Sequence, residues 1–242
     1  MTRNALVLFL LMASVACRSA RQAPLSAAPS SPATETAGVM PDSIRWTRSA
    51  VEYRAALWQV YRLATARIEA EARTRAAGTW AVVLDADETV ISNVEYQEAR
   101  ARERLPFSPE SWRAWVSRRE ATPLPGAAAF LSRARMLGGR IAIVTNRLQS
   151  ECADTEAVFK AHQLAYDAML CRADGGPSDK NPRFAAVAAG RTPLGSSALE
   201  IVAFVGDNIL DFPGLSQKSE AALEEFGVRF FVVPNAMYGS WQ

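Results

Sequence analysis

Apolar residues along the chain form short runs that alternate with stripes at helical spacing. Five runs have the length and composition of strands, and the third is the weakest: residues 81–84, 140–144, 166–171, 201–205 and 228–233. Apolar positions at helical spacing predict one helix within residues 49–76 and another at 126–137. This alternation is typical of an α/β fold. We expect a doubly wound, mostly parallel, Rossmann-like sheet with helices on both faces.

Residues 93–125 have a different character, with many charged residues, two tryptophans and four prolines. Ser108-Pro109-Glu110 is typical of a helix start, because proline fits the first helical turn. We predict that this segment is a small helical cap inserted at the ends of the strands. The sequence does not distinguish two roles for this segment: a lid over a ligand site, or an arm that only packs against the domain.

The amino-terminal segment has the pattern of an export signal. Arg3 precedes an apolar run that ends at Ala16, so residues 1–16 are expected to form a signal peptide, too short to span a bilayer. Cys17 follows, as in the lipobox of bacterial lipoproteins, which this stretch resembles. Ser14 stands where that motif usually has leucine, so cleavage without lipidation remains an alternative. We expect an exported protein in the periplasm or outer membrane, lipid-anchored at Cys17.

Composition separates the rest of the chain into two parts. Residues 17–45 are rich in Ala, Ser, Pro and Thr and predict a flexible tether, whereas residues 46–242 suffice for one domain. With 27 basic and 25 acidic residues the net charge is +2, which predicts no nucleic-acid partner. His162 is the single histidine and is expected at the surface, which disfavours a histidine nucleophile or a histidine-rich zinc site.

Acidic residues follow two of the predicted strands directly. Asp85 and Asp87 follow the first strand, and burying unpaired charge there would cost on the order of several kcal/mol. A hard divalent cation bound through oxygen would neutralise them. Asp207 and Asp211 follow the strand at 201–205. Because ligands bind beyond the carboxyl ends of parallel strands, these segments predict one metal and phosphate site.

Each segment taken alone has a simpler interpretation. Asp87 or Thr89 could cap a helix that follows the first strand. Thr145, at the end of the strand at 140–144, could cap a turn instead of donating to a phosphoryl oxygen. Lys180 lies in a predicted loop, where a lysine is by default a solvated surface residue.

The motifs together resemble a known superfamily. Asp85-x-Asp87-x-Thr89, Thr145, Lys180 and Gly206-Asp207-x-x-x-Asp211 resemble, in this order, the four motifs of the haloacid dehalogenase superfamily. The strings VLDADETVISNVEY (83–96), VGDNILDF (205–212) and PNAMYGSW (234–241) are similar to signatures of bacterial class C acid phosphatases, the exported lipoprotein 5′-nucleotidases of that superfamily. The likeness extends from about Trp46 to the last residue. Ala86 and Ile209 depart mildly from the usual residues and supply no catalytic group.

The resemblance implies a mechanism for Mg²⁺-dependent hydrolysis of phosphomonoesters. Asp85 would attack phosphorus and form an aspartyl-phosphate, and Asp87 would act as general acid and then base. Implied Mg²⁺ ligands are Asp85, the backbone carbonyl of Asp87, and Asp207, with Asp211 and Asn208 in support. The implied phosphate-binding residues are Thr145, Asn146 and Lys180, and the assignment of Lys180 rests on the family match.

The family resemblance also implies small phosphomonoesters as substrates, often 5′-nucleotides or nicotinamide mononucleotide, with the base held by aromatic stacking. Candidate substrate-binding residues are Tyr96, Trp112, Trp115, Arg147 and Tyr238, and core packing is the alternative for each aromatic. A homodimer is one of the assemblies that the sequence allows. Other functions to weigh are a phosphotransferase, a sugar-phosphate phosphatase and a non-catalytic binding protein. Cys152 and Cys171 could pair outside the cytoplasm or remain separate thiols.

Overall fold

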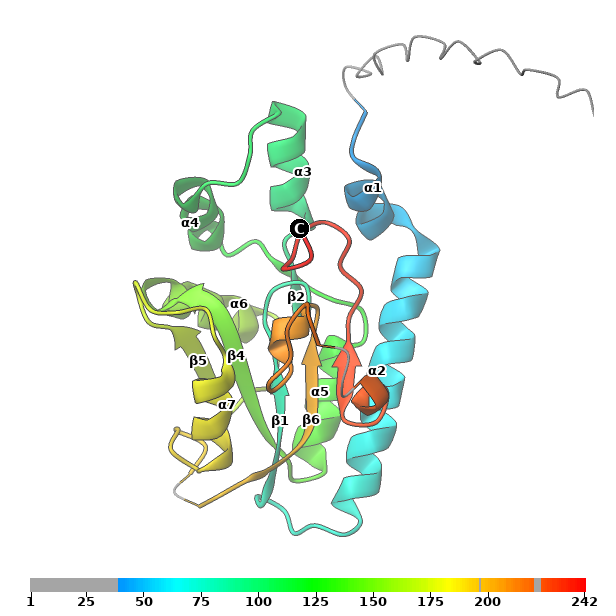
Figure 1. The fold of residues 1–242 in the computed structure, drawn as a ribbon, viewed down its shortest axis with the longest axis vertical. Helices are drawn as coiled ribbons and strands as arrows, with labels where there is room; N and C mark the ends of the chain where they lie inside the picture. The colour runs from blue at the N-terminus through cyan, green and yellow to red at the C-terminus, as the bar shows by residue number, and fades with distance from the viewer. Residues whose placement is uncertain (1–38, 196, 220–222) are drawn as a thin grey trace, which may run out of the picture. The chain divides into compact units, whose positions relative to one another are not determined.

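A computed structural model describes residues 39–195, 197–219 and 223–242 (Figure 1). The expected signal peptide, Cys17 and most of the expected tether lie outside these residues. The described part begins with helix α1 (Asp42–Ser49), which starts four residues before the expected domain boundary at Trp46. Within the described ranges, no helix combines the length and apolar character needed to cross a membrane.

A parallel sheet of five strands forms the centre of the domain, in the order β5-β4-β1-β6-β7. The strands are β1 (Trp80–Leu84), β4 (Arg140–Leu148), β5 (Ala168–Arg172), β6 (Glu200–Gly206) and β7 (Phe230–Val232). Leu84 is in register with Ile143 of β4 on one side and with Val205 of β6 on the other. The predicted α/β fold with a parallel sheet is therefore confirmed, and the carboxyl ends of all five strands meet at one edge.

Two apolar clusters cover the two faces of the sheet. Successive side chains of a strand point to opposite faces, so Val82 and Leu84 belong to one cluster and Ala81 and Val83 to the other. The first cluster is covered by α2 (Val51–Ala72), α5 (Ala127–Met136) and α6 (Cys152–Ala161). The second is covered by α7 (Asn181–Ala188). The described residues also form three short 3-10 helices: η1 (Gln149–Glu151), η2 (Ile209–Asp211) and η3 (Leu223–Glu225).

The segment expected to form a cap is helical. Strand β2 (Ile91–Ser92) pairs antiparallel with β3 (Thr122–Pro123), and α3 (Val94–Glu103) and α4 (Pro109–Arg118) lie between them in the chain. The Ser108 side chain accepts a hydrogen bond from the Ser111 N–H and so caps α4, as the sequence predicts for a helix start there. Figure 1 shows α3 and α4 beyond the carboxyl ends of the strands.

Cys152 and Cys171 form a disulfide, which settles the alternative that the sequence left open. Their Cα atoms are 6.1 Å apart, although 19 residues separate them in the chain. The bond joins the start of α6 to β5, so it fixes the segments on either side of the end of β4.

Candidate active site

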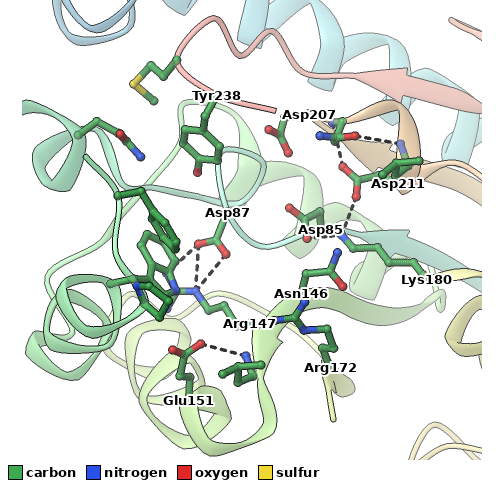
Figure 2. A pocket seen from close by; sticks show the side chains of 18 of the residues that line it. Asp85, Asp87, Asn146, Arg147, Glu151, Arg172, Lys180, Asp207, Asp211 and Tyr238 are labelled. Carbon is green, nitrogen blue, oxygen red and sulfur yellow. Dashed lines mark hydrogen bonds and ion pairs between the residues drawn. The ribbon is translucent and has the colours of Figure 1, made fainter. Parts of the chain in front are cut away.

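A cavity of about 780 Å³ opens at the carboxyl ends of the strands (Figure 2). Its walls come from the ends of β1, β4, β5 and β6, from the cap, and from the carboxyl-terminal segment. Ten residues predicted for the site line it: Asp85, Asp87, Trp112, Asn146, Arg147, Lys180, Asp207, Asn208, Asp211 and Tyr238. Segments far apart in the sequence thus converge on one edge of the sheet, as the motif positions predicted.

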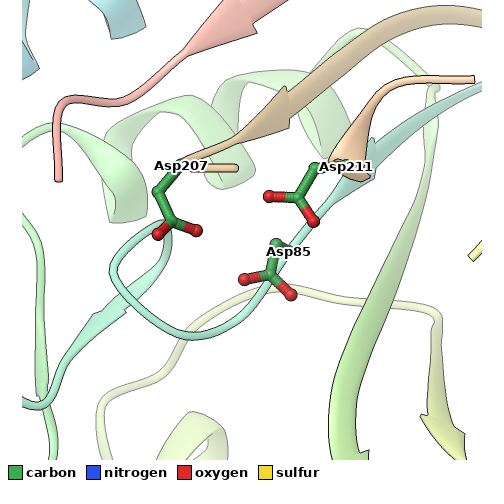
Figure 3. A group of neighbouring side chains, drawn as sticks. All are labelled: Asp85, Asp207 and Asp211. Atoms are coloured by element: carbon green, nitrogen blue, oxygen red, sulfur yellow. The ribbon is translucent and has the colours of Figure 1, made fainter. Parts of the chain in front are cut away.

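Three carboxylates gather at one side of this cavity (Figure 3). Carboxylate oxygens of Asp85, Asp207 and Asp211 lie within 4.8 Å of one another. Asp85 follows β1, Asp207 follows β6, and Asp211 ends η2, where its carboxylate accepts the backbone N–H of Asn208 at 2.9 Å. Lys180 Nζ donates to Asp85 Oδ1 at 2.5 Å and to Asp211 Oδ1 at 2.6 Å. Lys180 is therefore a buried member of the cluster and not a surface lysine.

Burial and mutual repulsion govern the protonation of this cluster. Burial raises the pKa of Asp85, the charges of Asp211 and Asp87 add to the rise, and the Lys180 ammonium opposes it. Burial and the charges of Asp211 and Asp85 raise the pKa of Asp207 as well. For Lys180, the neighbouring carboxylates outweigh the effect of burial, so its pKa is raised. The Lys180 ammonium contacts two of the three carboxylates, and the cluster of carboxylate oxygens fits a hard divalent cation.

Asp87 lies outside that cluster and pairs with Arg147. Arg147 donates through Nη2 to Asp87 Oδ1 at 2.7 Å, and through Nε to Oδ1 at 3.0 Å and Oδ2 at 3.2 Å. Asn93 Nδ2 also donates to Asp87 Oδ1, at 2.8 Å. The guanidinium carbon of Arg147 lies 5.3 Å from the centre of the Trp112 ring. Charge, hydrogen bonds and stacking together fix the orientation of the Asp87 carboxylate.

Asp87 and Arg147 form a second group of interacting side chains, separate from the carboxylate cluster. Asn93 and Glu88 belong to it, and the sequence analysis assigned no role to either. The fully buried Glu88 carboxylate accepts hydrogen bonds from the Asn93 N–H at 2.8 Å and from the Tyr238 hydroxyl at 3.1 Å. Burial raises the pKa of Glu88 to about 7. Asn93 Oδ1 accepts from Trp115 Nε1 at 2.8 Å and from Arg147 Nη2 at 3.1 Å. Asn93 thus connects the strand loop, the cap and β4.

The loop after β1 explains why no capped helix follows the strand directly. Glu88 has φ of 53°, a left-handed conformation that interrupts a helix, and α3 begins only at Val94. The Tyr61 hydroxyl of α2 donates to the carbonyl of Thr89 at 2.7 Å and so ties the loop to α2. The alternative in which Asp87 or Thr89 caps a helix is therefore excluded.

Three predicted site residues do not line the cavity. Thr145 is fully buried, and its hydroxyl oxygen accepts the N–H of Arg147 at 3.1 Å. Tyr96 and Trp115 are 4% and 3% exposed and pack together in the cap core, with the Tyr96 hydroxyl 2.8 Å from Ser111 Oγ. For these two aromatics the core alternative describes the observed position, whereas Trp112 and Tyr238 reach the cavity.

Other residues of the cavity carried no sequence signal beyond their residue type. Phe107, Arg113, Arg172 and Met237 line it from the cap, from β5 and from the carboxyl-terminal segment. Asn235 acts just outside it and donates through Nδ2 to Asp207 Oδ2 at 2.7 Å. Asn235 lies within the string PNAMYGSW, so the family resemblance marked the segment without assigning this side chain.

A parallel α/β sheet with clustered carboxylates and a buried lysine at its carboxyl edge defines the site of a metal-assisted phosphate-handling enzyme. Residues 7–241 match the family described as HAD superfamily, subfamily IIIB (Acid phosphatase), and the chain belongs to this family. The chain is also similar to the class C acid phosphatase from Bacillus anthracis, with 28% identity over 82% of this chain and 84% of that one, and a TM-score of 0.71.

A second structure of the Bacillus anthracis enzyme, described as having tungstate bound, matches over the same shares with 25% identity and a TM-score of 0.70. The predicted family is confirmed by these similarities. The chain is a phosphatase, and its reaction is the hydrolysis of phosphomonoesters.

Proposed function

We propose that this phosphatase is an exported, Mg²⁺-dependent enzyme that forms an aspartyl-phosphate and acts on 5′-nucleotides or nicotinamide mononucleotide. The observation that carries the proposal is the placement of Asp85 beside Lys180 and two further carboxylates, in the cavity that also holds the oriented Asp87. Tungstate, named for the related Bacillus anthracis structure, is a tetrahedral oxyanion with the shape of phosphate. This likeness supports a phosphoryl site in the cavity.

Asp85 is the proposed nucleophile. Lys180 holds Asp85 Oδ1, which leaves Oδ2 to form a bond to phosphorus while the bond from phosphorus to the leaving oxygen breaks. A bound Mg²⁺, held by Asp85, Asp207, Asp211 and the carbonyl of Asp87, would supply positive charge that screens the nucleophile from the anionic substrate. The cluster has three carboxylates and one ammonium group, and this imbalance of charge supports the binding of a cation.

Asp87 is the proposed acid and base. Its carboxyl group would give a proton to the leaving alkoxide and later accept one from the water that attacks the aspartyl-phosphate. The carboxyl must keep one position through both steps. Arg147 and Asn93 meet this requirement, since they hold Asp87 Oδ1 from two sides.

The phosphoryl oxygens would be bound by Lys180, Asn146 and Thr145. Asn146 faces the cavity, and its Oδ1 accepts from Arg183 Nη2 at 2.6 Å, so its amide nitrogen is the group turned to a ligand. The role of Thr145 rests on the family resemblance, because Thr145 is fully buried behind the cavity wall and its Oγ1 accepts the Arg147 N–H. Trp112 and Tyr238 supply aromatic surface at the other side of the cavity, which supports a nucleotide base there.

The test is phosphate release from a panel of nucleotides, nicotinamide mononucleotide and sugar phosphates, with and without Mg²⁺. Asp85→Asn should lower kcat by at least about 1,000-fold, because the variant loses its nucleophile. Asp154→Asn is the matched control, since this aspartate lies on α6 in a surface ion pair with Arg119. Undiminished turnover in Asp85→Asn, or turnover that ignores Mg²⁺, would refute the proposal.

Export is proposed from the amino-terminal sequence and from the disulfide. The apolar run that ends at Ala16 and the following Cys17 support a signal peptide and a lipid anchor. The disulfide between Cys152 and Cys171 supports the same location, because such bonds persist mainly in oxidising compartments.

A further inference from the structure

Arg172 is a cation of the cavity that the proposed mechanism does not use. Two buried cations that line the same cavity have partners: Arg147 pairs with Asp87, and Lys180 pairs with Asp85 and Asp211. Among the described residues, Arg172 forms no ion pair, and its buried Nε has no hydrogen-bond partner. A buried donor without a partner is costly, on the order of 1–3 kcal/mol. Arg172 lines the cavity, and its guanidinium pairs with no acidic side chain of the described residues, so it is placed to bind an anion from the cavity side.

The fold places Arg172 beside the phosphoryl site and not within it. Arg172 ends β5 and is in register with Leu148 of β4, and β4 separates β5 from β1. Neighbouring strands lie about 4.8 Å apart, so the ends of β1 and β5 are about 10 Å apart. Figure 2 shows Asn146 between Asp85 and Arg172, with Tyr238 on the opposite side of the cavity. The disulfide at Cys171 anchors the backbone next to Arg172.

The charged residues near Arg172 give it no counter-ion among the described residues. Arg183 lies close enough that the charge of Arg172, after the larger effect of burial, contributes to a lowered pKa of Arg183. Arg183 is itself occupied by hydrogen bonds to the carbonyl of Thr145 and to Asn146 Oδ1. Glu151 also lines the cavity, but its carboxylate accepts the Leu148 N–H at 2.9 Å and forms no ion pair with Arg172. An anion bound at Arg172 would supply the counter-ion that Glu151 does not.

We propose that Arg172 is a second anion subsite, which binds a negatively charged group of the substrate other than the phosphoryl group attacked by Asp85. The inference rests on the proposed function, in which Asp85 marks the first phosphoryl position. A guanidinium suits a phosphate group because its N–H donors can bind two oxygens at once. The enzyme should therefore favour substrates with two separated phosphate groups, of the nucleoside bisphosphate class, over matching monophosphates.

The test compares adenosine 3′,5′-bisphosphate with adenosine 5′-monophosphate, with release of the 5′-phosphate followed by chromatography of the products. The measured quantity is the ratio of kcat/KM for the bisphosphate to kcat/KM for the monophosphate. Arg172→Gln should lower this ratio at least about 10-fold, the effect expected for one charge-assisted contact. Arg172→Lys keeps the charge but loses the two-oxygen geometry, and it should give an intermediate ratio.

Arg113→Gln is the matched control, since Arg113 is a second cation of the cavity wall, carried by α4. It should leave the ratio as in the wild type. An equal fall in Arg113→Gln would assign the preference to the overall charge of the cavity, and an unchanged ratio in Arg172→Gln would show that no subsite exists there. Either result would overturn the inference.

Binding measurements separate this inference from the proposed function. Dissociation constants of both nucleotides, for wild type and Arg172→Gln, test the subsite even if the wild type hydrolyses neither. A selective loss of bisphosphate binding in Arg172→Gln would support the subsite in that case, while the absent turnover would count against the proposed function alone. Equal weakening of both nucleotides would overturn the inference.

Discussion

Two acidic groups line the same cavity and differ in how their charge is balanced. In the first, Asp85, Asp207 and Asp211 lie together, and the Lys180 ammonium contacts Asp85 and Asp211. In the second, Asp87 is held by the guanidinium of Arg147 and the amide of Asn93. The first group lacks positive charge and suits a cation, whereas the second is already neutralised and hydrogen-bonded.

The comparison shows how one short motif serves two purposes. Asp85 and Asp87 are two residues apart, but Asp85 stays at the end of β1 while the chain turns toward the cap immediately afterwards. The left-handed backbone of Glu88 lies in that turn. Beyond it, Asn93 and Arg147 donate hydrogen bonds to the Asp87 carboxylate. The first group therefore supplies charge and a nucleophile, and the second supplies a carboxyl group of fixed orientation.

The largest effect on stability is expected when the balanced group is broken. Arg147→Ala would leave Asp87 without its counter-ion in a mostly buried site, where the Arg147 side chain is 1% exposed and that of Asp87 18%. We expect the free energy of unfolding to fall by about 3–5 kcal/mol, as for other buried pairs that lose one partner. Urea unfolding followed by circular dichroism measures this change.

Arg119→Ala is the control for that measurement, because Arg119 pairs with Asp154 at the surface, with side chains 56% and 25% exposed. Exposed pairs contribute about 0–1 kcal/mol, so this variant should unfold almost as the wild type does. If both arginine variants lost the same stability, the second group would not be the tightly balanced unit described above.

A smaller effect should distinguish the first group through metal binding. Mg²⁺ at 100 times its dissociation constant should add about 2.7 kcal/mol to the stability of the wild type, because only the folded chain assembles the three carboxylates. Asp207→Asn should lose most of this gain, whereas Asp87→Asn should keep it, since the Asp87 carboxylate points away from the cluster to Arg147. Thermal unfolding with a chelator and with Mg²⁺ makes the comparison. Equal gains in both variants would contradict the assignment of the two groups.

Much of this arrangement could be predicted from the sequence, because it depends on the ends of buried strands. Asp85, Asp207 and Asp211 directly follow or closely follow apolar runs, and parallel strands bring their carboxyl ends to one edge. The alternation of strands and helices predicted a parallel sheet, and the change of composition at residues 93–125 predicted the helical cap. Lys180 was assigned only through the family resemblance, since a lysine before a short helix carries no pattern of its own.

The second group could not be predicted, because its contacts depend on loop conformation and on long-range packing. Nothing in the sequence around Glu88 marks its left-handed backbone, and Asn93 becomes central only when α4 brings Trp115 within 2.8 Å. Arg172 was missed for a similar reason. A single arginine at the end of a weak strand is distinctive only once the structure shows that its buried Nε lacks a partner among the described residues.

The smallest effect should come from the contact between the second group and the carboxyl-terminal segment. The Tyr238 hydroxyl donates to Glu88 at 3.1 Å, and Tyr238→Phe removes that donor while it keeps the ring that faces the cavity. Glu88 still accepts the Asn93 N–H, so a loss of about 1 kcal/mol in the free energy of unfolding is expected. Hydrogen exchange of the Asn93 and Val94 amides should rise in the variant, because Glu88 then holds the loop less firmly. Faster exchange confined to the chain beyond residue 234 would instead show that Tyr238 only anchors its own segment, and that the second group is complete without it.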